Sequence, residues 1–269
     1  MNAADQLHYK NIIKSIGFNK RLGQNFLLDD DVAKAEAVHV SGKRVLELGP
    51  GLGMLTKRLC EEADSVTAIE IDKKLYEFLL ANLSCKNLKI INADFFDVAE
   101  GEFKKADIIA SNVPYQISSK LLLWLSKKGI PAVLCLQKEF VNRMMAQPDT
   151  KEYSRLSVFC GLQFKISEII DVPASSFFPS PKVDSKVVYL KPKKTDISEK
   201  CATVISLIME HKNKKLRNAI QDSSSMLGFG KAEARKLADS FSECDSRVFT
   251  LQPQELLLIS NKIASLQKE

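Results

Sequence analysis

Short apolar runs rich in β-branched residues alternate with segments of helical periodicity between about residues 44 and 192. Buried strands are predicted in the runs RVLELG, SVTAIEID, NLKIINAD, ADIIASN and AVLCLQ. Helices are predicted around them, in LTKRLCEEA, KKLYEFLLANL, SKLLLWLSKK and EFVNRMMAQ. Since strands that alternate with helices form parallel sheets covered on both faces, this pattern predicts an α/β fold with a doubly wound, Rossmann-like sheet.

The pattern changes near residue 193. Two further strands are predicted in LSVFCGLQF and KVVYLK, around the proline-containing loop VPASSFFPSPKVDS. After the run KPKK the periodicity is helical, in ISEKCATVISLIMEHK, NKKLRNAIQDSSSML, KAEARKLADSF and PQELLLISNKIASL. We therefore expect a Rossmann-like domain over residues 1–193 and a small helical domain over residues 194–269.

Composition narrows the class of protein. The 269 residues are 45% hydrophobic, enough to bury the cores of one large and one small domain. No run approaches the roughly 18 to 20 apolar residues of a membrane span, and the N-terminus lacks the apolar region of a signal peptide, so we expect a cytoplasmic protein that does not bind membranes. The six cysteines are never closer than 25 positions and the three histidines have no metal-ligand spacing, so we expect reduced core thiols and no metal site.

Positive charge is concentrated in one part of the chain. The net charge is +6, but residues 182–236 hold 13 Lys and Arg against 6 Asp and Glu. Such a local excess is typical of a surface that binds nucleic acid, although it can also be an ordinary solvated face. Four of these cations are predicted to share one broad helix face and to contact RNA phosphates. They are Lys212, Lys214, Lys215 and Arg217. The alternative track for RNA runs along Lys20, Arg21 and the loop at Lys182.

The first predicted strand runs into VLELGPGLGMLT, whose glycine spacing limits the ligand. Gly49, Gly51 and Gly53 give G-x-G-x-G, which differs from the G-x-G-x-x-G that places a dinucleotide's pyrophosphate at a helix N-terminus. Glu47, two positions before the first glycine, would repel a phosphate. The turn therefore favours a cationic ligand without phosphate, although a glycine-rich turn alone can be a plain strand-to-helix connection.

Carboxylates end the second and third predicted strands. Glu70 is placed to accept hydrogen bonds from both hydroxyls of a ribose. Asp94 could accept one from an adenine amine, with Phe95 beside the ring. S-adenosylmethionine has a sulfonium, a ribose and an adenine and lacks phosphate, so these residues predict it as the cofactor.

The fourth predicted strand is followed by SNVPYQISS, which places Asn112, Pro114 and Tyr115 within four residues. The exocyclic amine of adenine is a poor nucleophile, because its lone pair is delocalised into the ring. An Asn112 oxygen and a backbone carbonyl before or at Pro114 could accept its two hydrogens and favour a pyramidal nitrogen. Tyr115 could stack on the base and stabilise the positive charge that develops. The motif thus predicts methyl transfer to adenine by positioning and electrostatics, without a strong general base; the plainer alternative is a strand-end turn with a buried tyrosine.

Six segments of the chain, in this order, resemble those of the KsgA-type ribosomal RNA adenine dimethyltransferases, the family that also contains the Erm enzymes and mitochondrial transcription factor B. They are KRLGQNFL, ELGPGLGMLT, IEID, AD, NVPYQISS and FFPSPKVDS, within residues 18–192. The resemblance implies a class I methyltransferase fold and a helical C-terminal domain that helps hold RNA. It also implies transfer of four methyl groups to two adjacent adenosines near the 3′ end of small-subunit rRNA. We expect the protein to work as a monomer.

The resemblance also assigns residues to the site. Asn25 and Leu27, within a cofactor-capping segment over residues 18–30, should line the methionine end of the cofactor. Phe177 would form the far wall of a sandwich with Tyr115. The full set of predicted cofactor contacts is Asn25, Leu27, Gly49, Gly51, Glu70, Asp94 and Asn112, and the predicted catalytic residues are Asn112, Pro114, Tyr115 and Phe177.

Alternatives stay open at this point. An Erm-like enzyme acting on large-subunit rRNA, or a DNA adenine methyltransferase, would share the pocket. A non-enzymatic assembly or transcription factor would keep the fold without the chemistry, but the intact NVPY motif argues against it. Val113 and Gln116 depart mildly from the family's usual residues and leave the chemistry intact. The segment EHKNKKLRNAI and the short helical tail are closer to archaeal than to bacterial members.

Overall fold

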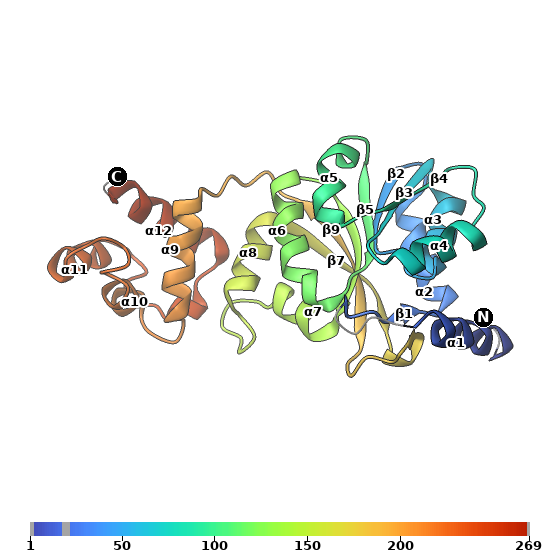
Figure 1. Cartoon of the computed structure of the whole chain (residues 1–269). Coiled ribbons are helices and arrows are strands. Elements are labelled where there is room, and N and C mark those ends of the chain that lie inside the picture. Colours follow the sequence, from blue (N-terminus) through green and yellow to red (C-terminus); the bar gives the residue numbers. More distant parts are fainter. Residues whose placement is uncertain (1–2, 18–21, 268–269) are drawn as a thin grey trace. The chain divides into compact units, whose positions relative to one another are not determined.

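The computed structural model describes residues 3–17 and 22–267. Its contacts divide the chain into two compact units, each built from two stretches of sequence (Figure 1). The first unit comprises Met1–Val141 and Ile166–Pro192, and the second comprises Asn142–Lys165 and Lys193–Glu269. The first unit holds the sheet, and the second is mainly helical.

Seven strands form the central sheet. They are β2 (Arg44–Leu48), β3 (Ser65–Glu70), β4 (Leu88–Asn92), β5 (Ile108–Asn112), β6 (Ala132–Gln137), β7 (Phe164–Val172) and β9 (Ser185–Pro192). Their order is β4-β3-β2-β5-β6-β9-β7, with parallel pairing from β4 to β6 and antiparallel pairing of β6 with β9. The strand order reverses between β2 and β5, and open α/β sheets bind ligands at the carboxyl ends of strands at such a point.

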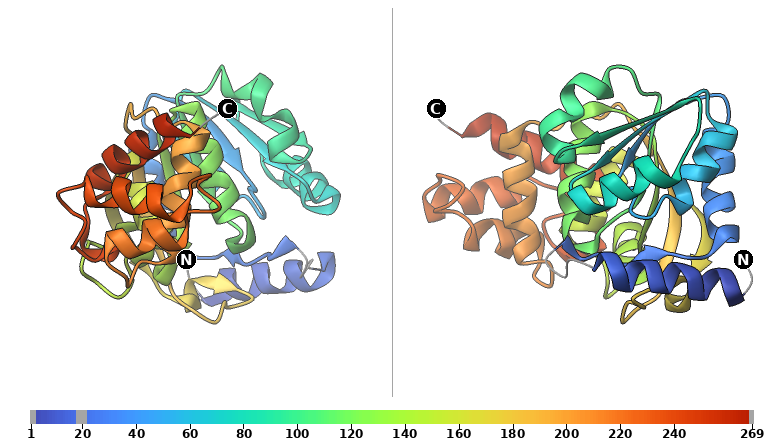
Figure 2. Two further views of the ribbon diagram at one scale, coloured as in Figure 1. Left: turned by 90° about the vertical axis from the view of Figure 1, so that its left-hand side faces the viewer. Right: turned by 45° about the vertical axis from the view of Figure 1, so that its right-hand side comes forward.

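Helices cover both faces of this sheet, as Figures 1 and 2 show. One side carries α2 (Asp30–Ala37), α3 (Met54–Glu62) and α4 (Lys73–Asn82), and the other carries α5 (Phe95–Phe103) and α6 (Ser118–Lys128). On the first side, Val32, Leu55 and Leu59 are buried in one core with the strands. On the other, the Trp124 ring joins α6 to α5, with its centroid 5.3 Å from that of Phe95. The predicted doubly wound α/β fold is confirmed.

Three further elements flank the sheet of the first unit: α1 (Ala3–Ile16), β1 (Phe26–Leu27) and β8 (Phe177–Phe178). The two short strands pair antiparallel, with Leu27 opposite Phe177. Phe26 and Phe177 are both buried. The pairing therefore fixes the segment before α2 against the loop that follows β7. One more helix, α7 (Lys138–Met145), follows β6.

The second unit is built from α8 (Arg155–Gln163), α9 (Glu199–Glu210), α10 (Leu216–Asp222), α11 (Lys231–Asp239) and α12 (Pro253–Leu266). Its core includes Val158 and Leu162 of α8 together with Ile208 of α9 and Ile259 of α12. Because α8 packs into this helical core, the structure groups residues 142–165 with the C-terminal helices, whereas the sequence pattern places them with the sheet.

The predicted strand LSVFCGLQF is wrong, because most of these residues form α8. The run is apolar throughout, and periodicity alone does not separate a buried strand from a buried helix. A capping box between Ser154 and Ser157 starts the helix, and the strand β7 begins only at Phe164. The helix predicted over NKKLRNAIQDSSSML is shorter than expected, because only Leu216–Asp222 are helical.

Candidate active site

A pocket in the first unit opens at the carboxyl ends of β2, β3 and β5. It holds about 290 Å³, close to the lower end of the range for drug-sized ligands, about 300–1,000 Å³. The structure brings together here every residue predicted for the cofactor and for catalysis. These are Asn25, Leu27, Gly49, Gly51, Glu70, Asp94, Asn112, Pro114, Tyr115 and Phe177. Their individual roles stay predictions.

The glycine turn after β2 needs residues without a side chain. Gly49, Gly51 and Gly53 all have positive φ, at 65°, 59° and 81°. A Cβ on Gly51 would lie 3.1 Å from the ring of Phe26. A Cβ on Gly53 would lie 2.5 Å from Leu83, so any side chain there would displace its neighbour. The turn therefore leaves bare backbone facing the pocket, which suits close approach by a ligand.

Glu70 ends β3 and is 4% exposed. Its carboxylate accepts the N–H of Gly51 at Oε2 over 3.1 Å and the N–H of Asp72 at Oε1 over 2.9 Å. Burial raises the pKa of Glu70 to about 7, against the lowering effect of these backbone hydrogen bonds. Asp72 in turn accepts the Gln24 side-chain amide over 3.0 Å. The acid predicted to bind ribose is thus held in place by backbone on both sides.

Glu47 lies in β2 and is 1% exposed. Burial raises its pKa to about 8, and its Oε2 accepts no hydrogen bond from the described residues. Nearby Glu36 is fully buried, with neither carboxylate oxygen partnered in that part of the chain, and burial together with Glu47 raises its pKa. Glu47 is therefore largely protonated at neutral pH in the free protein, so it repels a phosphate less than the sequence suggests, while a cation in the pocket would favour its ionised form.

Asp94 lies directly before α5 and caps it. Its Oδ1 accepts the N–H of Phe96 over 2.8 Å. A carboxylate has two acceptor oxygens, so the helix cap leaves one for an amine of a ligand. Phe95 is 5% exposed and lines the same part of the pocket.

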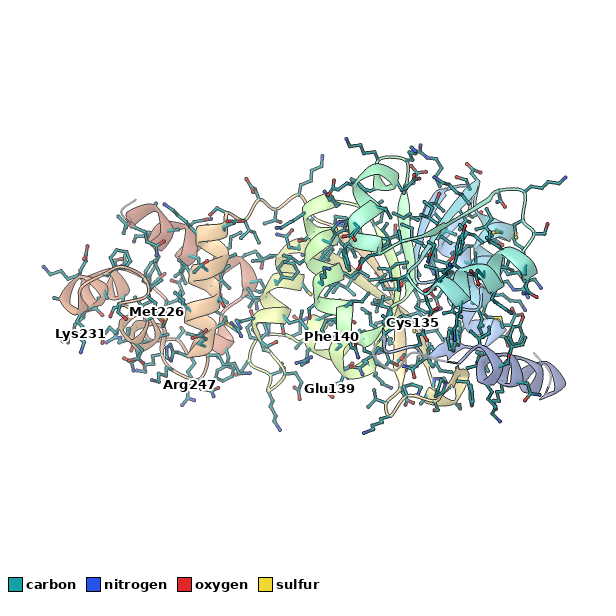
Figure 3. The ribbon with its side chains drawn as sticks, in the orientation of Figure 1. Cys135, Glu139, Phe140, Met226, Lys231 and Arg247 are labelled. Atoms are coloured by element: carbon teal, nitrogen blue, oxygen red, sulfur yellow. The ribbon has the colours of Figure 1, made fainter. Side chains whose placement is uncertain are left out.

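Asn112 is the last residue of β5 and lies opposite Cys135 of β6. Cys135 is labelled in Figure 3. The N–H of Val113 donates to the Cys135 carbonyl over 3.1 Å and extends the pairing beyond the strand. Asn112 Oδ1 is buried, yet it accepts no hydrogen bond from the described residues. A buried acceptor without a partner costs free energy, about 1–3 kcal/mol. Its position in the wall of the pocket points to a ligand donor as its partner.

Pro114 and Tyr115 lie just beyond β5. The Pro114 carbonyl accepts the N–H of Ile117 over 3.0 Å, and a carbonyl oxygen has a second lone pair for a ligand. The Tyr115 hydroxyl is 2.8 Å from Ser185 Oγ of β9. Burial raises the pKa of Tyr115, so its side chain is a neutral phenol at ordinary pH. The hydrogen bond to Ser185 therefore anchors the Tyr115 ring at its hydroxyl end.

Several residues that line the pocket are absent from the predicted set, among them Ile71, Gln116 and Lys120. Ile71 is 50% exposed, and it follows Glu70 directly in the IEID motif. Gln116 and Lys120 also line the pocket, and Lys120 Nζ lies 3.8 Å from the centroid of the Phe96 ring. The sequence could have predicted Ile71, because it directly follows Glu70 and residues next to a strand-end ligand contact share its pocket.

The predicted basic helix face is wrong. Lys212 and Lys214 lie in the turn between α9 and α10, Lys215 precedes α10, and only Arg217 is helical. The reason is tertiary: the Lys212 and Lys214 carbonyls accept backbone N–H groups from the segment after Arg247, and Lys215 forms an isolated bridge with Arg247.

The four cations also have partners within the second unit. Lys212 Nζ donates to the carbonyls of Lys151 and Tyr153. Lys214 pairs with Asp222 over 2.7 Å. Both Lys215 and Arg217 pair with Asp245, over 2.9 and 2.6 Å. Of the alternative track, Lys182 is exposed, while Lys20 and Arg21 lie outside the described residues.

The described residues also bear on metal binding and on membrane insertion. No group of three or more His, Cys, Asp or Glu side chains among them could hold a metal ion. None of the helices in that part of the chain is both long enough and apolar enough to cross a membrane.

The sheet order, the antiparallel strand β9 and the acid-lined pocket at the reversal point define a class I, Rossmann-like methyltransferase. The 23S rRNA methyltransferase ErmE has this fold, with a TM-score of 0.56 and 23% identity over 90% of this chain and 100% of that chain.

Closer relatives fix the family. The model of the ribosomal RNA adenine dimethylase family matches residues 16–264. A probable ribosomal RNA small subunit methyltransferase A of Thermococcus onnurineus is 39% identical over 246 residues, 88% of this chain and 89% of that protein. A dimethyladenosine transferase structure from Plasmodium falciparum has a TM-score of 0.76 and 28% identity, over 88% of this chain and 98% of that one. The chain belongs to the ribosomal RNA adenine dimethylase family.

Membership confirms three predictions. The protein is an rRNA adenine methyltransferase, its methyl donor is S-adenosylmethionine, and its substrate is rRNA. The pocket fits that donor in three respects. The glycines of the turn have no side chains that would crowd a ligand, and the buried Glu70 offers acceptors for polar groups. The unpartnered Asn112 oxygen is a further acceptor that suits a cationic ligand.

Proposed function

We propose that the protein dimethylates N6 of two adjacent adenosines near the 3′ end of small-subunit rRNA and so contributes to the biogenesis of that subunit. The Thermococcus relative, a probable small subunit methyltransferase, supports the small subunit as target. ErmE acts on 23S rRNA, but its likeness to this chain concerns the fold alone. An Erm-like target on the large subunit is therefore the second candidate.

The observation that carries the proposed chemistry is the buried, unpartnered oxygen of Asn112. This oxygen accepts one N–H of the adenine amine, and the second lone pair of the Pro114 carbonyl accepts the other. Held in this way, the nitrogen turns its lone pair away from the ring and toward the methyl group. Such positioning can supply a large part of a rate enhancement without a strong general base.

Aromatic rings hold the target base. Tyr115 stacks on one face and stabilises the positive charge that develops on the adenine. Its hydroxyl bond to Ser185 fixes the ring at one angle. Phe177, held by the pairing of β8 with β1, forms the opposite wall. The adenosine leaves any base stack to reach this position.

The remaining pocket residues hold the methyl donor. Glu70 accepts hydrogen bonds from the ribose, Asp94 accepts one from the adenine amine, and Asn25 and Leu27 line the methionine end. Gly49 and Gly51 offer bare backbone to the donor, and a side chain on Gly51 would meet the Phe26 ring. When bound, S-adenosylmethionine supplies the methyl group from its sulfonium.

The second unit contributes RNA contacts by phosphate binding. Its cations Lys214, Lys215 and Arg217 are half-exposed and can exchange their Asp partners for phosphates, because exposed ion pairs are weak. Phosphate contacts of this kind position RNA without reading its bases. An rRNA substrate supports a cytoplasmic location, and we propose that the enzyme acts there as a monomer.

The experiment that tests the target uses isolated substrates in parallel. Tritiated methyl transfer from labelled donor is measured on unmethylated small subunits, on large subunits and on duplex DNA. We expect label on small-subunit rRNA only. Preferred labelling of large subunits would support the Erm-like target instead, and absence of label on all three would contradict the proposed dimethylation.

A further inference from the structure

The helix α1 packs against the outside of the donor pocket. Four of its residues form one apolar cluster with residues in and just after β1, in the glycine turn and in α4. The helix contributes Tyr9, Ile12, Ile13 and Ile16, and the cluster also contains Phe26, Leu28, Leu52 and Leu75. Ile13 is 1% exposed, whereas its neighbour Asn11 is exposed. Figures 1 and 2 show α1 beside β1.

Three members of this cluster face the pocket as well as the helix. Phe26, Leu52 and Leu75 each line the donor site. The same side chains therefore form part of the pocket wall and part of the core on which α1 packs. Nearly all of α1 lies before residue 16, where the match to the family model begins.

Shared packing and one hydrogen bond link α1 to Glu70. Ile13 packs in one cluster with Phe26. The Phe26 ring lies against Gly51, so closely that a Cβ there would be 3.1 Å away. Gly51 donates its N–H to Glu70 Oε2 over 3.1 Å. A shift of Phe26 therefore changes the space beside the turn whose backbone orients Glu70.

The start of α4 holds the same region from the other side. Lys74 Nζ donates to the carbonyl of Ile16 over 3.2 Å, and the Gln24 amide donates to Asp72 Oδ2 over 3.0 Å. Asp72 also donates its backbone N–H to Glu70. The end of α1 and the segment that leads into β1 are thus tied to one turn of helix next to the donor site.

We propose that α1 is a positioning element for the methyl donor: its apolar face presses Phe26 against the glycine turn and thereby sets donor affinity without touching the donor. Packing that preorganises a binding site raises affinity, because less conformational freedom is lost on binding. The proposal rests on the donor site and is independent of which rRNA is methylated.

The first test measures donor binding by calorimetry. We expect Ile13→Ala to weaken binding of S-adenosylmethionine and of its demethylated product alike, by roughly 5- to 50-fold, the range of a modest coupling between two sites. Ile13→Leu, which refills the space, and Asn11→Ala, on the exposed face of the same helix, should bind as the wild type does. Ile16→Ala, at a half-buried position, serves as a milder second variant with a smaller effect in the same direction.

A double-mutant cycle decides whether Ile13 acts through Phe26. Donor affinity is measured for Ile13→Ala, Phe26→Ala and the combined variant. If α1 works through the Phe26 ring, Ile13→Ala has little further effect once that ring is removed. Turnover at saturating donor and rRNA binding should stay near wild type in Ile13→Ala. Unchanged donor affinity in Ile13→Ala and Ile16→Ala, or fully additive effects in the cycle, would overturn the proposal.

Discussion

The backbone N–H of Gly51 donates to Glu70 Oε2 over 3.1 Å, which joins the glycine turn after β2 to the acid at the end of β3. The two residues are 19 positions apart, and the strands that lead to them, β2 and β3, are parallel neighbours. Because the same carboxylate also accepts the N–H of Asp72, both its oxygens are oriented by backbone before a ligand binds. A site arranged in this way loses little freedom when the donor binds.

Glu70→Ala should weaken donor binding by about 1 to 3 kcal/mol, because two hydrogen bonds from the ribose to a carboxylate are lost. Calorimetry with the donor and its demethylated product measures this directly. Glu139→Gln, an exposed position labelled in Figure 3, is the control. Wild-type affinity in Glu70→Ala would remove Glu70 from the donor site.

Glu47 should make stability depend on pH. Its folded pKa of about 8 lies above the ordinary value of 4.5. Between these two pH values, the folded state keeps a proton on Glu47 that the unfolded state releases. The contribution of Glu47 to the free energy of unfolding is therefore full below about pH 4.5 and is lost as pH rises to about 8. The free energy of unfolding, measured in urea, should fall less between pH 5.5 and pH 8.5 in Glu47→Gln than in the wild type. An identical loss in both proteins would contradict the buried, protonated state of Glu47.

Tyr115→Ala should lose about 1 to 3 kcal/mol of base stacking, measured as binding of a short adenosine-containing RNA in the presence of the demethylated product. Tyr115→Phe keeps the ring and loses only the hydroxyl contact with Ser185, so it should bind RNA much better than Tyr115→Ala. Phe177→Leu should weaken binding in the same way as Tyr115→Ala if its ring forms the other wall. Equal binding by all three variants and the wild type would mean that the base does not enter between these rings.

The cations of the second unit should contribute to the salt dependence of rRNA binding. For Lys214→Ala and Lys215→Ala, each lost phosphate contact should lower the slope of log affinity against log salt by about 0.7 to 0.9 units. Lys73→Ala, an exposed, ion-paired lysine of the first unit, is the control. Wild-type slope and affinity in the double variant would mean that both lysines serve only their pairs with Asp222 and Asp245.

The sequence predicts the pocket well for a physical reason. Parallel strands end at one edge of a sheet, so Glu70, Asp94 and Asn112 had to meet wherever NLKIINAD, SVTAIEID, RVLELG and ADIIASN formed neighbouring parallel strands. Asn25 and Phe177 carried no such signal of their own. Only the resemblance to a family placed them, and the pairing of β1 with β8 is what brings their segments to the pocket.

The errors lie where tertiary contacts override local pattern. The run LSVFCGLQF has no periodicity that distinguishes its two possible states, and its burial against the C-terminal helices decides for α8. Lys212 and Lys214 follow helical residues in sequence, but their carbonyls pair with the segment after Arg247. Neither of these long-range contacts can be predicted from the local sequence.

The proposed chemistry requires that the Asn112 oxygen orients the adenine amine for methyl transfer. The most direct test is mass spectrometry of small-subunit rRNA after reaction with the wild type and with Asn112→Ala at saturating donor. We predict two adjacent N6,N6-dimethyladenosines near the 3′ end with the wild type. With Asn112→Ala we predict little or no methylation at either position, although the variant still binds the donor and the rRNA. Full dimethylation by Asn112→Ala would contradict the claim.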